Sequence, residues 1–310
     1  MSRLLCIIDG MTDASFSVAD YPLLAAMRSP AQVQTTPRGQ KTESLTCILA
    51  LLGVSTPPPF LRGYVEALGA GIDVDRDDLI LRISWLALQE GRYGAPVAAP
   101  SALRHSCAAR YHCLGGYQGL LILPGAAAML EQIRVRPFFS KGSNKAADLR
   151  PQGLPLLAQI FDQNCAEGIC PAFWGQSRPV SLPPFPGRAA VVCGSGVMRG
   201  IARLLAMQLL PVPGATGDVD TNLAAKLATA QAAAEEYPFV VLHINGADEA
   251  SHRRDAVAKH RFLTRVEQQV LRPLCNSRHT LYVIADHATE PSNGRHRGGP
   301  QPLFYHAMGK

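Results

Sequence analysis

The chain has 310 residues, of which 47% are hydrophobic and 17% are charged. This composition is typical of an ordinary folded protein and excludes a disordered, collagen-like or coiled-coil chain. The formal net charge is +6, but the basic residues are dispersed and do not alternate with aromatic ones, so we expect no nucleic-acid partner. A pocket for a small anionic substrate explains the excess equally well.

The N-terminal segment MSRLLCIIDGMTD holds one short apolar run. Residues Leu4–Ile8 predict a first strand, and Asp9 with Gly10 predicts a turn after it. The run is too short for a secretory signal or a membrane span. We therefore expect a cytoplasmic protein without a membrane partner.

Eight cysteines are spread over the chain, and no two of them form a CxxC pair. Without an export signal, the simplest expectation is reduced and mostly buried thiols, and the missing CxxC pair argues against a structural zinc ribbon or knuckle. Cys165 and Cys170 are close in sequence but lack matching partners. The set is Cys6, Cys47, Cys107, Cys113, Cys165, Cys170, Cys193 and Cys275.

The next elements are a helix and then a region of different texture. Less regular sequence runs to about Gly39, and a helix is predicted over 43–53, where Gly53 suits a C-terminal cap. Pro57–Pro59 break the chain. From 67 to 186, alternating runs such as 79–85 and several Gly/Pro turns predict a smaller α+β domain.

After the Pro-rich segment 182–187, strands and helices alternate. Strands are predicted at 189–193, 239–244 and 280–285, and helices at about 197–209, 220–236 and 249–274. This order predicts an α/β fold with a mostly parallel sheet covered by helices on both faces. The chain therefore divides into a core, residues 1–66 and 187–310, and an inserted domain, residues 67–186.

Three predicted strands end in residue types that bind metals. They lead to Asp9, to Asp248 with His252, and to Asp286 with His287. Because ligands bind at the carboxyl ends of strands in open α/β sheets, these side chains are expected to converge. Each segment alone has an ordinary explanation, such as a turn, a helix cap or a surface ion pair.

The details of these segments leave some choices open. Asp248 and His252 are four residues apart and share one face of a helix that begins near Asp248. Asp286 and His287 can diverge at a strand-to-loop break, one toward each of two ions. His296 is a further candidate, or an exposed loop histidine. Mixed Asp/His ligation suits Mn²⁺ or Zn²⁺ better than Ca²⁺ or Mg²⁺.

A two-metal site needs a nucleophile, and Ser44 is the candidate. It begins the predicted helix 43–53, where the helix dipole and free N–H groups favour a phosphate. A serine hydroxyl near metal ions loses its proton more easily. The alternative is a simple N-cap, with Thr42 and Thr46 as rival hydroxyls and Cys47 as a core residue.

Six motifs, in order, resemble the cofactor-independent phosphoglycerate mutases, in particular the archaeal-type branch of this family within the alkaline phosphatase superfamily. DGMTD (9–13) is similar to the family's DGxGD, and RGYVEALGAGI (62–72) to RGPxEAxGAGI. The segment ESLTCILALLG (43–53) lies where the family carries its nucleophile helix. The other matches are GATGDVDTNLAAK (214–226), ADEASH (247–252) and ADHATEPSNGRHRGG (285–299).

The resemblance implies an alkaline-phosphatase-like α/β core with an inserted domain that closes as a lid. It places Asp248, His252 and His296 on one metal and Asp9, Asp286 and His287 on the other, with Ser44 between them and the phosphate. It also implies Lys226 and Arg82 as substrate-binding residues. The expected cofactors are two divalent ions, Mn²⁺ first with Zn²⁺, Co²⁺ or Mg²⁺ as alternatives, and no organic cofactor.

The implied activity is the interconversion of 3- and 2-phosphoglycerate through a phosphoserine, a step of glycolysis, in a protein expected to be a monomer. Glu43, Leu45 and Ile48 differ from the family's nucleophile helix, which usually reads close to GSDTAH. A second hypothesis is therefore a phosphatase or phosphotransferase of the same superfamily that acts on another phosphoester or phosphonate. A third is a non-catalytic protein that binds metal or a phospho-ligand.

Overall fold

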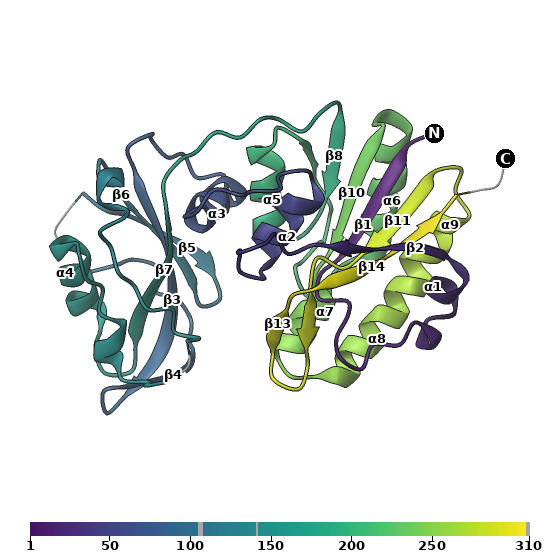
Figure 1. The fold of residues 1–310 in the computed structure, drawn as a ribbon. Coiled ribbons are helices and arrows are strands. Elements are labelled where there is room, and N and C mark those ends of the chain that lie inside the picture. Colours follow the sequence, from purple (N-terminus) through teal and green to yellow (C-terminus); the bar gives the residue numbers. More distant parts are fainter. Residues whose placement is uncertain (105–107, 141, 308–310) are drawn as a thin grey trace. The chain divides into compact units, whose positions relative to one another are not determined.

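The computed structural model describes residues 1–104, 108–140 and 142–307. The chain forms two compact units, which are described separately (Figure 1). Unit 1 comprises residues 1–57 and 182–310, and unit 2 comprises residues 58–181. The boundaries expected from the sequence, after residues 66 and 186, lie nine and five residues further along the chain than those between the units, after residues 57 and 181.

Unit 1 is built on a mixed sheet whose centre is parallel. In the described part of this unit the strand order is β2 (Arg28–Gln34), β14 (Pro300–His306), β11 (Thr280–Ile284), β1 (Arg3–Ile8), β10 (Phe239–Ile244), β8 (Ala189–Val192) and β9 (Gln208–Leu210). The strands from β11 to β9 pair in parallel, whereas β14 and β2 pair antiparallel. The predicted α/β class with a mostly parallel sheet is confirmed.

The central strands are almost wholly apolar because both faces of the sheet are covered. On one face, Leu4, Cys6 and Ile8 of β1 share a buried core with Ala230 of α6 and Phe262 of α8. The helices of unit 1 are α1 (Pro22–Ala26), α2 (Ser44–Leu51), α5 (Gly196–Leu204), α6 (Leu223–Glu236), α7 (Gly246–His252), α8 (Ala256–Val266) and α9 (Arg272–Cys275), with a 3₁₀ turn at Val18–Asp20 and a π-helical segment at Glu267–Leu271.

Two helix predictions were wrong in part, one at its end and one in its interior. The helix expected to run to residue 209 ends at Leu204, and Ala206 has a φ of 54° before β9 begins. The helix expected over 249–274 is interrupted, because Arg254 has a φ of 60° and the Asp255 carboxylate accepts a hydrogen bond from the Ala258 N–H, which starts a new helix.

The segment before Gly39 also contains more structure than expected. It forms α1 and the edge strand β2. The sequence RSPAQVQ has little strand character, and its proline is tolerated because an edge strand need not donate every hydrogen bond. Strand β2 therefore depends on β14, its partner in the fold.

Unit 2 is an α+β fold around one antiparallel sheet (Figure 1). Its long strand β3 (Leu79–Gln89) pairs with β7 along one edge and with β6 and then β4 along the other. The remaining elements are α3 (Arg62–Ala70), β4 (Arg92–Pro96), β5 (Arg110–Gly115), β6 (Gln118–Leu123), α4 (Pro155–Asn164) and β7 (Cys170–Ser177), with 3₁₀ turns at Ala127–Met129 and Ala146–Leu149. Trp85 lies at the centre of the core.

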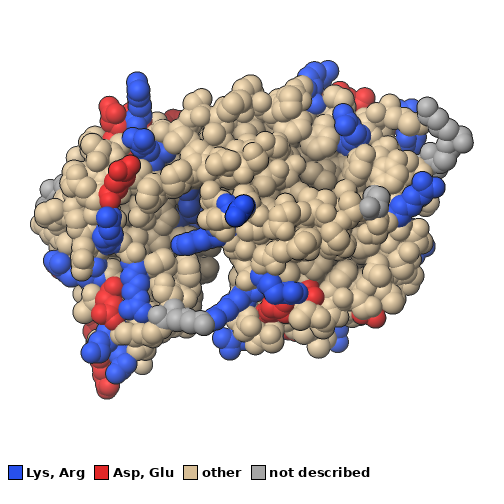
Figure 2. Space-filling model, in the orientation of Figure 1, with Lys and Arg blue, Asp and Glu red and all other residues tan. Residues whose placement is uncertain are grey.

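The distribution of surface charge and the length of the helices concern two expectations from the sequence, namely that the protein has neither a nucleic-acid partner nor a membrane partner. Figure 2 shows lysine and arginine side chains spread over the visible face with acidic side chains among them. Among the described residues, every helix is too short or too polar to cross a membrane.

A buried ion pair holds the turn after β1 in unit 1. The Lys259 ammonium lies 2.6 Å from the Asp13 carboxylate and donates to the carbonyl oxygens of Thr12 and Thr289 at 3.1 and 2.9 Å. Both side chains of the pair are nearly inaccessible. Lys259 thereby fastens the segments that follow β1 and β11 to helix α8.

We expect Lys259→Met to destabilise the protein by about 3 kcal/mol, because it leaves a buried carboxylate and two carbonyls without their partner. Denaturant unfolding measures this loss. Arg150→Met removes an exposed pair with Asp162, which solvent screens, and should change stability much less than Lys259→Met. Equal effects of the two substitutions would contradict the structural role of Lys259.

Candidate metal centre and nucleophile

The site lies at the carboxyl ends of three neighbouring strands. Strand β1 pairs in parallel with β10 on one side and with β11 on the other. Asp9 directly follows β1, and Asp286 with His287 follows β11. Asp248 lies on α7, which begins two residues after β10. The topology therefore brings these side chains together at one edge of the sheet, as the sequence predicts.

Asp9, Asp286 and His287 form the first group of potential metal ligands. All three are fully buried, and one ligand atom from each lies within 4.8 Å of the others. The Nε2 atom of His287 is 3.5 Å from Asp9 Oδ1 and 3.4 Å from Asp286 Oδ2. Asp286 and His287 therefore both offer ligand atoms to this group, and His287 offers one to the second group as well.

Asp248, His252 and His296 form the second group. The Asp248 carboxylate lies 3.1 Å from His252 Nε2 and 3.4 Å from His296 Nε2, and the two Nε2 atoms are 3.1 Å apart. Asp248 and His252 share helix α7, as their spacing predicts. His296 lies in β13 (Arg295–Arg297), which pairs with β12 (Ala288–Glu290), so the expected loop is a short ribbon.

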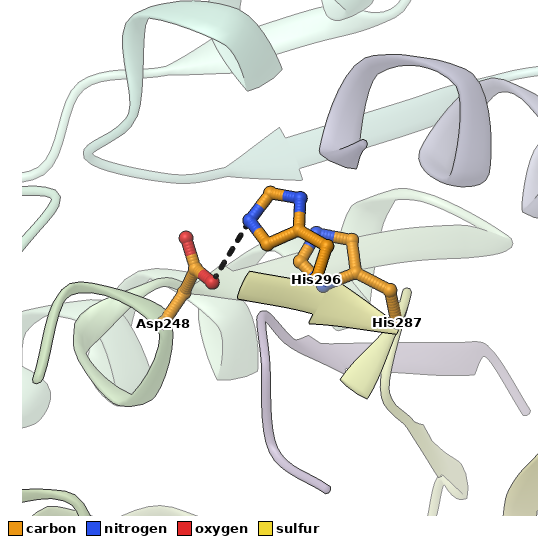
Figure 3. Close-up of side chains that lie close together, drawn as sticks. All are labelled: Asp248, His287 and His296. Carbon is orange, nitrogen blue, oxygen red and sulfur yellow. Dashed lines mark ion pairs between the residues drawn. The ribbon is translucent and has the colours of Figure 1, made fainter. Parts of the chain in front are cut away.

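His287 lies between the two groups. Its ring stacks on that of His296 with centroids 3.9 Å apart, and Asp248, His287 and His296 also offer ligand atoms within 4.8 Å of one another. Figure 3 shows the two imidazoles lying over one another, with Asp248 facing His296. The ligand atoms thus form one continuous cluster.

The hydrogen bonds of His252 and His296 fit metal ligation. The Nδ1 atom of His252 faces the Gly294 carbonyl at 2.9 Å, and that of His296 faces the Thr42 carbonyl at 3.2 Å. A carbonyl oxygen only accepts, so each Nδ1 carries a hydrogen, and each Nε2 offers a lone pair to the cluster when its ring is neutral. Against the effect of burial, the hydrogen bond and charge of Asp248 raise the pKa of His252 to about 9, so a cation would displace the proton from its Nε2 on binding. Such outer hydrogen bonds are typical of metal-binding histidines.

The carboxylates also fit a cationic occupant. Burial, followed by the charges of Asp286 and Asp248, raises the pKa of Asp9 well above its usual range. The Oδ2 atom of Asp286 is buried and has no hydrogen-bond partner among the described residues. Burial lowers the pKa of His287, which keeps its imidazole neutral. Divalent cations would neutralise the carboxylates and use the free lone pairs.

Ser44 is the hydroxyl that faces this cluster. It is the first residue of α2, and its Oγ lies 3.3 and 3.4 Å from the Asp9 carboxylate oxygens and 3.2 Å from His287 Nε2. The Thr46 hydroxyl donates to the Lys41 carbonyl instead, and that of Thr42 contacts Thr36. Cys47 is buried, as expected.

Thr289 connects the two groups and escaped sequence reasoning. Its hydroxyl donates to Asp248 Oδ1 at 2.6 Å and lies 3.2 Å from His287 Nδ1. Having given its hydrogen to the carboxylate, the oxygen accepts from Nδ1–H, which leaves the lone pair of His287 on Nε2. The sequence signal that could have identified Thr289 is its position two residues after the candidate ligand His287.

We expect Thr289→Val to weaken divalent-metal binding by about 10- to 100-fold, because the substitution removes the hydrogen bonds that orient Asp248 and His287. Calorimetric titration with Mn²⁺ measures this change. Thr289→Ser keeps the hydroxyl and should restore most of the affinity. Equal metal binding by the valine and wild-type proteins would contradict the role given to Thr289.

Two further residues adjoin Asp9, a half-buried asparagine and a buried histidine. Asn245 donates from Nδ2 to Asp9 Oδ2 at 2.9 Å, and its own Oδ1 is buried without a partner among the described residues. His243 Nε2 lies 3.6 Å from Asp9 Oδ2, and burial lowers the pKa of His243 to about 3, so it is neutral. His243 lies in β10, and Asn245 follows the end of this strand. Neither was predicted from the sequence as a site residue.

The two expected substrate-binding residues are both buried. Lys226, in α6, donates to the carbonyls of His243 and Thr216 at 3.1 and 3.4 Å, and burial lowers its pKa to about 8. Arg82, in β3 of unit 2, forms an ion pair with Glu66, and its guanidinium lies 5.0 Å from the centre of the Trp174 ring. Lys226 thus lies next to β10, whereas Arg82 belongs to the other unit.

Family models match two parts of the chain. Residues 185–309 match the metalloenzyme superfamily, and residues 30–106 match 2,3-bisphosphoglycerate-independent phosphoglycerate mutase. The mutase of this name from Methanosphaera stadtmanae is 32% identical over 100% of this chain and 90% of its own length. The chain belongs to this family. A second relative, mutase 2 of Methanothermobacter thermautotrophicus, is 26% identical and is covered over 88% of its length.

Solved structures agree with this family for the fold. A protein from Pyrococcus horikoshii has a TM-score of 0.71 at 20% identity, with 99% of this chain and 87% of that chain covered. The cofactor-independent phosphoglycerate mutase of Thermoplasma acidophilum has a TM-score of 0.52 at 16% identity, with 100% and 90% covered. The chain therefore shares the fold of these two solved structures.

Proposed function

We propose that this protein interconverts 3- and 2-phosphoglycerate by metal-dependent phosphoryl transfer through a phosphoserine at Ser44. The observation that carries this proposal is the Ser44 hydroxyl within 3.5 Å of Asp9 and His287, inside a cluster of three aspartates and three histidines. The family supports the substrate, since its members are named phosphoglycerate mutases.

We assign Asp9, Asp286 and His287 to one divalent ion and Asp248, His252 and His296 to the other, with Ser44 next to the first. Bound ions would neutralise charge on the transferring phosphoryl group. The mixture of carboxylate and imidazole ligands favours Mn²⁺, with Zn²⁺, Co²⁺ or Mg²⁺ as alternatives, and the reaction needs no organic cofactor.

In the proposed reaction the Ser44 oxygen attacks the phosphorus atom, and the bond from phosphorus to the substrate oxygen breaks. Ser44 begins α2, so the N–H groups of the first helical turn face the phosphate. The Asp9 carboxylate accepts the hydrogen bond of the serine hydroxyl and orients its oxygen. The phosphoryl group then returns to the other hydroxyl of the retained glycerate.

Unit 2 is proposed to act as the substrate-binding lid, with Arg82 as an anion-binding residue and Lys226 near the phosphate in unit 1. A lid excludes water, which would otherwise hydrolyse the phosphoserine and release phosphate. The dispersed surface charge and the small anionic substrate favour a protein without a nucleic-acid or membrane partner. We propose a cytoplasmic monomer.

The test is a time course of 3-phosphoglycerate with metal-free protein and with protein reloaded with Mn²⁺. The reloaded protein should form 2-phosphoglycerate, with little inorganic phosphate, and the metal-free protein should form neither. Phosphate release without 2-phosphoglycerate would instead support the second candidate, a phosphatase. Two residues favour that candidate: Glu43 stands where the family's nucleophile segment usually has glycine, and Leu45 stands where it usually has aspartate.

A further inference from the structure

Two cysteines of unit 2 lie next to each other at the base of a tight turn. Cys165 directly follows α4, and Cys170 is the first residue of β7. Their sulfur atoms are hydrogen-bonded at 3.3 Å. Neither residue has a matching partner in a sequence motif, and the fold makes them partners of each other.

The register of the turn brings their backbones close together. Ala166 and Ile169 form an antiparallel bridge and exchange both backbone hydrogen bonds, at 3.0 and 2.9 Å. Cys165 and Cys170 directly flank this bridge, and their sulfur atoms already lie 3.3 Å apart. A disulfide has an S–S length of about 2.0 Å, so the two sulfurs need to approach by only about 1.3 Å. The bond can form with little backbone movement.

The two thiols differ in access and acidity. Cys165 is half-buried, whereas Cys170 is fully buried. The hydrogen bond between the two thiols lowers the pKa of Cys165 and raises that of Cys170. This is the arrangement of an accessible attacking thiol beside a buried resolving thiol.

The other described cysteines lack this combination. Burial raises the pKa of Cys6, Cys47, Cys193 and Cys275, which are buried in unit 1. Cys113, in β5, is exposed. Of the residues that the structure describes, Cys165 and Cys170 are thus the pair suited to reversible oxidation.

We propose that Cys165 and Cys170 are a redox-active dithiol that closes to a reversible intramolecular disulfide with a small-molecule disulfide as oxidant. The Cys165 thiolate attacks one sulfur of the oxidant and expels a thiolate, which takes up the proton that Cys165 lost. Cys170, deprotonated, then attacks the Cys165 sulfur and expels the second thiolate, which takes up the Cys170 proton. Two protein thiols and one disulfide become one protein disulfide and two small thiols.

The bond would join the end of α4 to the start of β7. In the sheet, Cys170 is paired with Leu86 of β3, and further along the same ladder Trp174 is paired with Arg82. Oxidation would therefore tether the start of β7, the strand that carries Trp174, to the end of α4. This inference is independent of the proposed function, because it concerns thiols outside the metal cluster.

The test equilibrates the full-length, metal-loaded protein with mixtures of reduced and oxidised glutathione, followed by alkylation and peptide mapping by mass spectrometry. We expect a disulfide between Cys165 and Cys170 that dithiothreitol reverses. Cys170→Ala should stop the reaction at a glutathione adduct on Cys165, and Cys113→Ser should behave as wild type.

Free thiols at both positions, in mixtures that attach glutathione to the exposed Cys113, would overturn the proposal. So would a disulfide that joins Cys165 to a different cysteine. Circular dichroism of each variant, compared with wild type, ensures that the thiols compared belong to folded protein.

Discussion

Ser44→Ala should lower the rate of phosphoglycerate interconversion by about 10⁴-fold or more, because a methyl group cannot accept the phosphoryl group. The change removes one small polar atom at the start of α2, where the N-cap position is held by Glu43 and not by Ser44. The fold should therefore stay intact. A coupled assay that consumes 2-phosphoglycerate measures the rate over the required range.

The rival hydroxyls provide the matched control. Thr42→Ala removes a hydroxyl two residues away, while the backbone carbonyl of residue 42 still accepts the hydrogen bond of His296. Its activity should stay within about 10-fold of wild type, since surface and rim contacts carry little of the transition-state stabilisation. Comparable losses in the two variants would show that α2 as a whole, rather than the Ser44 oxygen, is required.

Asp286→Asn should lower activity by about 10³-fold and reduce the metal content of the purified protein, because a neutral amide replaces a charged ligand. The substitution is nearly isosteric. The amide oxygen can keep the hydrogen bonds that Asp286 Oδ1 accepts from the N–H groups of Gly10 and His287 at 3.3 and 2.9 Å. The atom that changes is Oδ2, which lies 3.4 Å from His287 Nε2 and has no hydrogen-bond partner among the described residues.

The metal-free Asp286→Asn protein should be at least as stable as metal-free wild type. The charge of Asp286 is one of the causes that raise the pKa of Asp9, so its removal relieves a repulsion between buried carboxylates. Thermal melts with and without Mn²⁺ separate the two effects, since wild type should gain more from the metal. Asp162→Asn, in an exposed pair with Arg150, is the control. A metal-free variant much less stable than wild type would assign Asp286 a structural role.

The parts of the fold that could be predicted are those set by long apolar runs. Strands β1, β10 and β11 are almost continuous buried sequence, so their existence and parallel order follow from the chain itself. The interruption after His252 did not follow, because the residues around it are compatible with a helix. It depends on the conformation of Arg254 and the cap at Asp255.

The same division holds within the site. The convergence of Asp9, Asp248 and Asp286 could be predicted because strand ends converge, and the predicted helix start suggested Ser44. The resemblance to the family added the division of the ligands between two ions. Thr289 and Asn245 could not be predicted, because a buried threonine or asparagine has no distinctive spacing. Their contribution lies in which atoms they contact, and that depends on tertiary packing.

The most direct test of phosphoryl transfer through Ser44 is to locate the phosphoryl group on the enzyme. The Mn²⁺-loaded protein is mixed with 3-phosphoglycerate, quenched with acid after a short delay, and digested for mass spectrometry. We predict phosphorylation of the peptide that contains residues 43–53 at Ser44, and none in Ser44→Ala. Turnover of 3-phosphoglycerate with the phosphoryl group on another residue, or undiminished turnover by Ser44→Ala, would contradict the account.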